Sequence, residues 1–339
     1  MIADILKEND IKSLRGYIHN YNDIIITCHV SPDGDAVGAC LALCHLLRGI
    51  GKNSIVILPD QAPKNLSFLH GYRGMLPYTM FQNRANVLIE KAELIFCLDF
   101  NALYRVDKLY DSIEKATAKK VLIDHHLDPE QFCDITMSYS IMSSTCELLF
   151  RVIKALNMVD LLDEKSAECI YAGMMTDTGN FSYNSNRAGI YTIISELIGK
   201  GIDKDKIYRL VMNTSTESRL RLIGYSIYDK MEVYSDSSAA LITLTQEELK
   251  RFDYKKGDTE MLVNIPLGIP EVKWVIFMRE EDGYIKISAR SKGDFAVNKI
   301  CEQYFGGGGH KNASGGEFRG SLEDAVATYH RILENLKNN

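Results

Sequence analysis

Short, continuous runs of apolar residues alternate with longer segments of mixed polarity through the first half of the chain. The runs that predict strands are Ile24–His29, Ser54–Pro59, Leu94–Phe100 and Val121–His125. Such runs are typical of strands that are covered on both faces. The segments between them predict helices at Asp35–Gly51, Asn83–Ala92 and Leu103–Ala118. This β-α-β rhythm predicts an α/β fold with a doubly wound, mostly parallel sheet.

Beyond residue 140 the pattern first becomes helical and then returns to strands. Helices are predicted at Ser144–Leu156, Glu164–Thr176 and Arg187–Lys200, and a polar helical segment at Asp203–Asp229. Later runs predict strands at Val233–Thr245, Lys273–Arg279 and Tyr284–Arg290, and an amphipathic helix at Leu322–Leu336. A chain of 339 residues is long enough for two domains. We therefore expect a first domain at residues 1–200, a helical linker at 201–230 and a smaller α/β domain at 231–339.

The charge balance restricts the kinds of partner. The formal net charge is −6, and 25% of the residues are charged. Long nucleic acid normally requires a basic surface, so we expect no binding to long duplexes, whereas a local pocket can still hold a small phosphorylated substrate. The N-terminus has no signal-peptide pattern, and the apolar stretch Ala36–Leu47 is too short to span a bilayer. We expect a cytoplasmic protein without a membrane partner.

Aspartate and histidine, whose side chains commonly bind metal ions, follow the ends of several predicted strands and helices. They are His29, Asp33, Asp35, Asp99, Asp124, His125, His126 and Asp177. In a doubly wound sheet the carboxyl ends of the strands open into one crevice, so these residues are expected to converge there. Taken singly, each also has a purely structural explanation. Asp35 could cap its own helix, and a histidine at a strand end is often only hydrogen-bonded.

The spacing of the ligands suggests how two cations share them. His29 and Asp33 can reach one cation around a tight turn, while Asp35 serves a second. Asp99 is then placed to bridge the two cations. The second site is completed by His125 and Asp177. Carboxylates with a minority of imidazoles favour Mn²⁺ or Mg²⁺ over Zn²⁺, and none of the eight cysteines forms a Cys-x-x-Cys pair.

A second group of polar residues lies nearer the C-terminus. Consecutive glycines at 306–309 precede His310 and permit a loop whose N–H groups bind an anion. Arg290 ends a predicted strand and offers bidentate contact to a phosphate. The candidate substrate contacts are Arg290, Asn298, Gly307, Gly308, Gly309, His310 and Ser314. Alternatives stay open, because the glycine run could be a flexible linker and Arg290 could form a surface ion pair.

The chain resembles the DHH phosphoesterase superfamily, and the resemblance rests on five motifs in order. They are His29-Val-Ser-Pro-Asp-Gly-Asp-Ala36, Leu98-Asp99, Asp124-His125-His126, Asp177-Thr-Gly-Asn-Phe181 and Gly306–Gly316, the last of which is similar to the DHH-associated domain. The resemblance implies one metal on His29, Asp33 and Asp99 and a second on Asp35, Asp99, His125 and Asp177. It also implies that Asp124 supports an imidazole and that His126 faces the substrate.

Within the superfamily, the sequence looks most like the nanoRNase/pAp-phosphatase branch, also described as exopolyphosphatase-related. The resemblance implies hydrolysis of short oligoribonucleotides or 3′-phosphoadenosine 5′-phosphate (pAp) by a hydroxide held between two Mn²⁺ ions. Arg290 is expected to neutralise phosphoryl charge, and His126 or His310 to assist the leaving group. The alternatives are cyclic di-AMP or its linear product pApA as substrate, inorganic pyrophosphate or polyphosphate as substrate, and nucleotide binding without catalysis. The oligomeric state, including a homodimer, stays open.

Overall fold

The chain divides into two compact units in the computed structural model, which describes residues 5–213 and 215–337. Unit 1 is Met1–Thr214 and unit 2 is Ser215–Asn339. The division falls inside the segment 201–230, which the sequence pattern predicts to be a linker. Among the described residues, no helix is both long enough and apolar enough to cross a membrane.

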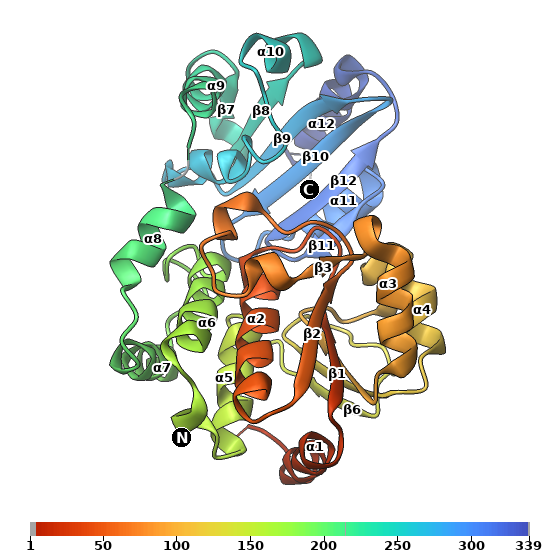
Figure 1. Ribbon diagram of the computed structural model, residues 1–339. Coiled ribbons are helices and arrows are strands. Elements are labelled where there is room, and N and C mark those ends of the chain that lie inside the picture. Colours follow the sequence, from red (N-terminus) through yellow and green to blue (C-terminus); the bar gives the residue numbers. More distant parts are fainter. Residues whose placement is uncertain (1–4, 214, 338–339) are drawn as a thin grey trace. The chain divides into compact units, whose positions relative to one another are not determined.

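Unit 1 is built around a six-stranded parallel sheet with the order β3-β2-β1-β4-β5-β6 (Figure 1). Its strands are β1 Asp23–Thr27, β2 Asn53–Leu58, β3 Leu76–Pro77, β4 Leu94–Leu98, β5 Lys119–Asp124 and β6 Ile135–Ser138. The four strands predicted from apolar runs are all present, and the predicted doubly wound parallel sheet is confirmed. The edge strands β3 and β6 are short and have no counterpart among the predicted strands.

Helices cover both faces of this sheet, because successive side chains of a strand point to opposite sides. Ile24 and Ile26 pack on the face of α2, α5 and α6, whereas Ile25 packs on the face of α3 and α4. Figure 1 shows the same division of the helices about the strands. The helices are α1 Glu8–Asn20, α2 Gly34–Gly49, α3 Tyr78–Lys91, α4 Tyr110–Lys115, α5 Thr145–Ala155, α6 Glu164–Asp177, α7 Ala188–Gly199 and α8 Lys204–Met212, with 3₁₀ segments η1 Lys64–Leu66, η2 Tyr72–Gly74, η3 Leu103–Leu109 and η4 Val159–Leu161.

Helices α2 and α6 pack closely because glycines stand where they meet. A Cβ at Gly34 would lie 2.3 Å from Thr176 Oγ1, and a Cβ at Gly173 would lie 2.3 Å from Cys146 Sγ of α5 and 3.0 Å from Asp35 Oδ1 of α2. Contacts this short cannot be relieved without moving the helices apart in a close-packed interior. The two glycines therefore allow the first turn of α2 to approach the last turns of α6.

Unit 2 contains a second six-stranded sheet, with the order β11-β12-β10-β9-β8-β7. Strands β8 and β9 are parallel, and the other neighbours are antiparallel. One face packs with α11 and α12 around Trp274, and the other packs with α9 and α10 around Val275. The elements are α9 Glu217–Tyr228, β7 Met231–Tyr234, η5 Ser235–Ser237, β8 Ala239–Leu244, α10 Gln246–Arg251, η6 Leu262–Gly268, β9 Trp274–Glu281, β10 Tyr284–Ser291, α11 Val297–Tyr304, β11 Gly308–His310, β12 Ala313–Phe318 and α12 Leu322–Lys337.

Four predicted segments differ from the structure, and one of them, Asp203–Asp229, forms the two separate helices α8 and α9. The predicted strand Val233–Thr245 is interrupted by η5 and by Ser238, whose positive φ of 48° reverses the chain between β7 and β8. The predicted helix Leu103–Ala118 is instead η3 followed by the short helix α4, with a kink at Asp107, where φ is 47°. The glycine run contributes strand β11, Gly308–His310, and not an open loop. Two of these differences come from a local backbone reversal, which the hydrophobic pattern does not report.

Candidate metal centre and substrate-binding residues

The predicted metal ligands lie together at the carboxyl edge of the sheet in unit 1. They follow β1, β4, β5 and the end of α6, and they are His29, Asp33, Asp35, Asp99, His125 and Asp177. The strand order changes direction between β1 and β4, which is where ligands bind in open α/β sheets. Asp99 follows β4 with a positive φ of 65°, a conformation that aspartate adopts more readily than most residues. A hydrogen bond of 3.1 Å from Asp99 N to Ile123 O holds it there.

Asp99 presents one carboxylate oxygen to each of two histidines. Its Oδ2 lies 3.4 Å from His29 Nε2, and its Oδ1 lies 3.6 Å from His125 Nε2. Thr145 Oγ1 donates a hydrogen bond of 2.8 Å to the same Oδ1 and so helps to fix the plane of the carboxylate. The Asp99 side chain is only 2% exposed. A buried carboxylate oriented in this way can offer an oxygen to each of two neighbouring cations.

His29, Asp33 and Asp99 form the first ligand group, with ligand atoms within 4.8 Å of one another. His29 Nδ1 donates to Val30 O at 2.8 Å, which leaves Nε2 as the nitrogen that can bind a cation. Asp33 caps α2, since its Oδ1 accepts two hydrogen bonds of 3.0 Å from N–H groups of the first turn. Its Oδ2 lies 4.0 Å from His29 Nε2. The cap of α2 is therefore Asp33, whereas the sequence left Asp35 open to that role.

Asp35, His125 and Asp177 form a second group within the same 4.8 Å. Asp35 is 1% exposed and accepts hydrogen bonds from Thr145 N at 2.6 Å and from Cys146 N at 2.9 Å. These N–H groups belong to the first turn of α5, where the helix dipole favours negative charge. His125 Nε2 lies 3.5 Å from Asp177 Oδ2, while its Nδ1 lies 3.4 Å from a backbone carbonyl oxygen.

The electrostatics of the two groups favour bound cations. Burial raises the pKa of Asp177 to about 7, with His125 opposing the shift and Asp99 adding to it. Burial and the neighbouring carboxylates also raise the pKa of Asp35. Burial lowers the pKa values of His29 and His125, but Asp99 outweighs it and raises them to about 10 and about 9. Without a metal, bound protons thus compensate the negative charge of the carboxylates. Divalent cations can replace these protons, because they bind sets of oxygen and imidazole donors of this kind.

Asp124 holds His126 in one orientation. Its Oδ1 accepts a hydrogen bond of 2.7 Å from His126 Nδ1, and its Oδ2 accepts one of 3.1 Å from the His126 backbone N–H. Asp124 is fully buried. His126 Nδ1 also lies 3.9 Å from Asp99, but Asp124 already engages this nitrogen, so it is poorly suited to bind a metal. Nε2 is therefore the ring atom through which His126 can exchange a proton.

The predicted substrate contacts of unit 2 lie on adjacent elements of its sheet and on α11. Arg290 belongs to β10, which pairs with β12, and Gly309 of β11 pairs with Ser314 of β12. Burial raises the pKa of the Cys301 thiol, whereas Ser314 and Arg290 lower it, which places these three side chains close together. Among the described residues, the buried atom Asn298 Oδ1 forms no hydrogen bond. An unpaired buried oxygen of this kind favours a ligand at the same place.

The glycine run serves the packing of a hairpin. A Cβ at Gly307 would lie 1.9 Å from Gly315 O, and Gly309 has a φ of 144°, which other residues rarely adopt. Gly307 N donates to Cys301 O at 3.0 Å, and β11 pairs with β12. The last two glycines of the run are therefore in the edge strand β11 where an open loop was expected, and His310 is exposed at the end of this strand.

Comparison with known proteins identifies the family. The N-terminal domain of the DHH family matches residues 23–174, and the DHHA1 domain matches residues 239–335. A solved structure of an exopolyphosphatase-related protein from Bacteroides fragilis is 49% identical, with 98% of this chain and 97% of that chain covered and a TM-score of 0.96. This chain belongs to the DHH family. The resemblance predicted from the five motifs is confirmed.

Two curated relatives of this DHH protein carry a functional name. The "Probable bifunctional oligoribonuclease and PAP phosphatase NrnA" of Streptococcus mutans is 27% identical over 328 residues, which are 96% of this chain and 98% of that protein. The "Bifunctional oligoribonuclease and PAP phosphatase NrnA" of Bacillus subtilis is 27% identical over 296 residues, which are 87% of this chain and 89% of that protein. The similarity thus extends over both the DHH and the DHHA1 domains.

Without metal ions, the DHH domain should become less stable as the pH rises. The folded protein raises the pKa of His29 to about 10 and that of His125 to about 9. The two protonated histidines therefore stabilise the folded state fully below the unfolded pKa of about 6.5, and this contribution is lost as the pH rises through the folded pKa values. Asp177 also has a raised pKa, so its contribution falls as the pH rises from about 4 to about 7. We expect Mn²⁺ to raise the melting temperature more at pH 8 than at pH 6, in calorimetry of chelated and metal-loaded protein. Equal increases at the two pH values would contradict this ligand set.

A buried ion-pair network, which the sequence reasoning missed, holds the first turn of α5. Glu147 is fully buried, and it accepts hydrogen bonds from Arg151 Nε at 3.0 Å through Oε1 and from Arg187 Nη2 at 2.8 Å through Oε2. The same Oε2 accepts the N–H and the hydroxyl of Ser143, both at 2.7 Å. The network therefore anchors the turn whose N–H groups bind Asp35. The Ser-x-x-Glu pattern there signals a helix start, but it does not report contact with a metal centre.

We expect Arg187→Met to weaken metal binding while the protein stays folded. The change removes one of the two cations that hold Glu147 and so loosens the turn that positions Asp35. Loss of such an outer partner typically costs 10–100-fold in metal affinity, so the Mn²⁺ concentration for half-maximal activity should rise about tenfold. Arg187→Lys should recover part of the affinity, and Arg48→Met, at the far end of α2, should leave it unchanged. A lower melting temperature with an unchanged Mn²⁺ requirement would mean that the network is only structural.

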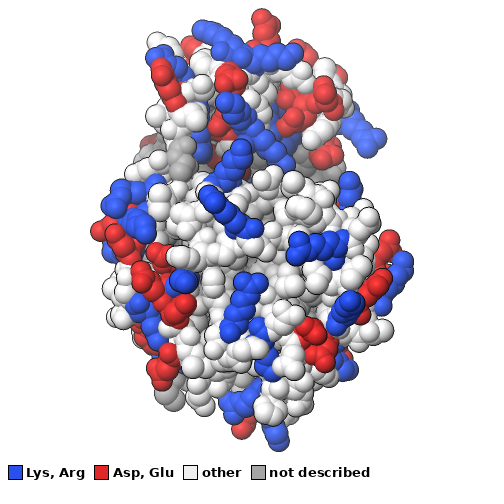
Figure 2. All heavy atoms as spheres, in the orientation of Figure 1, with Lys and Arg blue, Asp and Glu red and all other residues white. Residues whose placement is uncertain are grey.

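Charged side chains of both signs are spread over the face drawn in Figure 2. On this face, the Lys and Arg side chains stand in separate groups, many of them with uncharged residues between them, and do not form one continuous basic band. Such a face, together with the net charge of −6, is unlike the basic surface that binds long nucleic acid.

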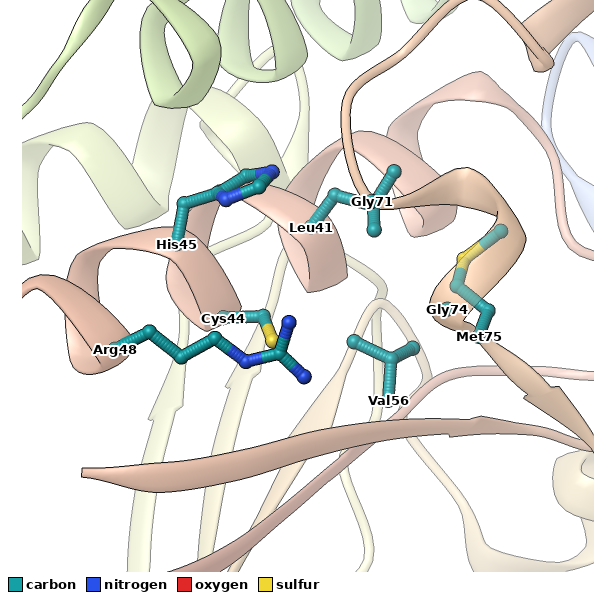
Figure 3. Close-up of a pocket in the computed structure, with 8 residues that line it drawn as sticks. All are labelled: Leu41, Cys44, His45, Arg48, Val56, Gly71, Gly74 and Met75. Atoms are coloured by element: carbon teal, nitrogen blue, oxygen red, sulfur yellow. The ribbon is translucent and has the colours of Figure 1, made fainter.

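A small cavity in the DHH domain lies away from the metal ligands, between α2, β2 and the loop before β3 (Figure 3). Its lining residues are Leu41, Cys44, His45, Arg48, Val56, Gly71, Gly74 and Met75. Its volume is about 10 Å³, which is barely enough for one water molecule. His45 Nε2 already bonds to His70 O at 2.8 Å, and Arg48 Nη2 bonds to Ser54 O at 2.7 Å. The cavity is therefore too small, and its polar groups too fully paired, to hold a substrate.

Proposed function

We propose that this DHH protein hydrolyses phosphoester bonds in short oligoribonucleotides and in pAp. The observation that carries the proposal is the ligand cage, in which Asp99 offers one oxygen to each of two ligand groups. The relatives support the choice of substrate, because they are named as oligoribonucleases and PAP phosphatases and are matched over most of their length. Residues 1–200 would form the catalytic domain and residues 231–339 the substrate-binding domain, joined by the linker 201–230.

The donor set supports two Mn²⁺ ions as the cofactor, with Mg²⁺ as a substitute. One ion would be held by His29, Asp33 and Asp99, and the other by Asp35, Asp99, His125 and Asp177. When bound, such ions neutralise phosphoryl charge and supply an acidified water for hydrolysis.

The chain's own residues would orient the substrate and move protons. His126, fixed through Nδ1 by Asp124, can give a proton to the leaving oxygen through Nε2. Arg290 offers parallel N–H groups to a phosphate, and His310 is exposed on the edge strand β11. The unpaired oxygen of Asn298 can only accept, which suits a ribose hydroxyl better than a phosphate.

A substrate panel with Mn²⁺ tests the proposal. The panel contains pAp, very short RNAs, pApA, cyclic di-AMP, pyrophosphate and polyphosphate, with the products separated by chromatography. We expect turnover of pAp and of the short RNAs. Turnover restricted to cyclic di-AMP and pApA would favour a cyclic dinucleotide phosphodiesterase. Release of phosphate from the inorganic chains alone would overturn the proposal.

A further inference from the structure

The segment Asn101–Arg105 joins two loops of the metal centre. Val30 N donates to Arg105 O at 2.8 Å, which ties the segment to the residue after the ligand His29. On the other side, Asn101 Nδ2 donates to Leu127 O at 2.7 Å, and three further hydrogen bonds link the segment to the same loop. The segment therefore lies at the switch point of the sheet, between the loop of the first ligand and the loop of the DHH triplet.

Two adjacent side chains of this segment are an exposed aromatic ring and a partly buried cation. Tyr104 is 69% exposed, although its neighbour Leu103 is buried in the core. Arg105 is partly buried, and within the part of the chain that the structure describes its guanidinium forms no hydrogen bond or ion pair. A partly desolvated cation without an acidic partner is costly unless a ligand compensates it.

Exposed apolar side chains lie on both loops that the segment joins. Val30 is 37% exposed and Leu127 is 54% exposed, and the hydrogen bonds to the segment hold the backbones of both residues beside it. Apolar side chains next to a strongly charged centre form no favourable contacts with an inorganic phosphate chain. They suit a ligand that carries a flat, apolar ring close to its phosphate.

We propose that Tyr104 and Arg105 form a nucleotide-binding subsite of the DHH domain. Tyr104 stacks on a nucleobase, and Arg105 binds a phosphate outside the metal cage. The inference rests on the proposed function and names the part of the substrate that this edge receives. Stacking accepts every base, which suits RNA fragments of mixed sequence, and the guanidinium fork matches two oxygens of one phosphate.

Calorimetric titration of the Mn²⁺-loaded protein with AMP and with ribose 5-phosphate tests the subsite, because the two ligands differ only by the base. We expect the wild type to bind AMP more tightly. Tyr104→Ala should weaken AMP binding about tenfold and leave ribose 5-phosphate unchanged, whereas Tyr104→Phe should keep the preference. Arg105→Gln should weaken both ligands about tenfold, with partial recovery in Arg105→Lys. Tyr191→Ala on α7 and Lys108→Gln on η3 are controls that should change neither affinity.

The outcomes separate this inference from the proposed function. Equal weakening of both ligands by Tyr104→Ala overturns the stacking role, and unchanged binding in Tyr104→Ala and Arg105→Gln overturns the subsite. The same holds if the wild type shows no preference for AMP. A base-dependent loss in Tyr104→Ala supports the subsite even where the substrate panel shows no nucleotide turnover, and that second result counts against the proposed function alone. Melting temperatures of the variants confirm that the compared proteins are folded.

Discussion

Asp99→Asn should lower kcat on pAp by more than about 100-fold while the protein stays folded. Asparagine matches aspartate in size and tolerates the positive φ of 65° at this position, so the backbone should be retained. The hydrogen bond from Thr145 can also remain. What disappears is the negative charge that lies between His29 and His125, and with it the ligand that both groups share. The measurement is kcat at saturating Mn²⁺, with the melting temperature as the test of folding.

The matched control is Asp111→Asn, which removes one negative charge from an exposed position on α4, where Asp111 pairs with the exposed Lys115. This variant should keep wild-type activity. If Asp99→Asn retained activity within a few-fold of the wild type, Asp99 could not be the shared ligand, and the two-group arrangement would have to be abandoned.

Asp124→Asn should lower kcat about 100-fold with little change in the Mn²⁺ requirement. The buried carboxylate accepts the proton of His126 Nδ1, which leaves Nε2 to exchange a proton with the substrate. An amide can donate a hydrogen bond to Nδ1 instead, and this stabilises the opposite tautomer of the ring. The loss should therefore appear in kcat and in its pH dependence, with KM nearly unchanged. Steady-state kinetics over a pH series measure both quantities.

Asp128→Asn is the control for this change, because Asp128 is exposed just after the triplet and has a positive φ of 53° that asparagine also tolerates. Its kinetics should match those of the wild type. A parallel loss of Mn²⁺ affinity in Asp124→Asn would instead show that Asp124 binds metal directly and does not act through His126.

The sequence predicted the parts of the molecule that depend on local pattern. Continuous apolar runs predicted the parallel sheet, since only strands covered on both faces carry them. The rule that strand ends meet at one edge then predicted that His29, Asp99 and His125 lie together, and the structure places Nε2 of each histidine within 3.6 Å of a carboxylate oxygen of Asp99. Both predictions depend on the order of strands and helices along the chain and not on how their side chains pack.

Contacts between distant segments were beyond the reach of the sequence. Asp35 is bound by N–H groups of α5, about a hundred residues later, and no pattern near either segment reports this pairing. The same holds for Glu147 and Arg187, because a buried ion pair looks like two ordinary charged residues until the helices are packed. The glycines before His310 were read as a loop, since the approach of Gly307 to Gly315 is visible only in the folded hairpin.

The most direct test of the central claim is electron paramagnetic resonance of the protein titrated with Mn²⁺. The central claim is that Asp99 joins two metal sites, so the wild type should bind two Mn²⁺ ions per chain and show the spectrum of an exchange-coupled pair. Asp99→Asn should lose the coupled spectrum while Asp111→Asn keeps it. A single uncoupled Mn²⁺ in the wild type, or an unchanged coupled spectrum in Asp99→Asn, would contradict the claim.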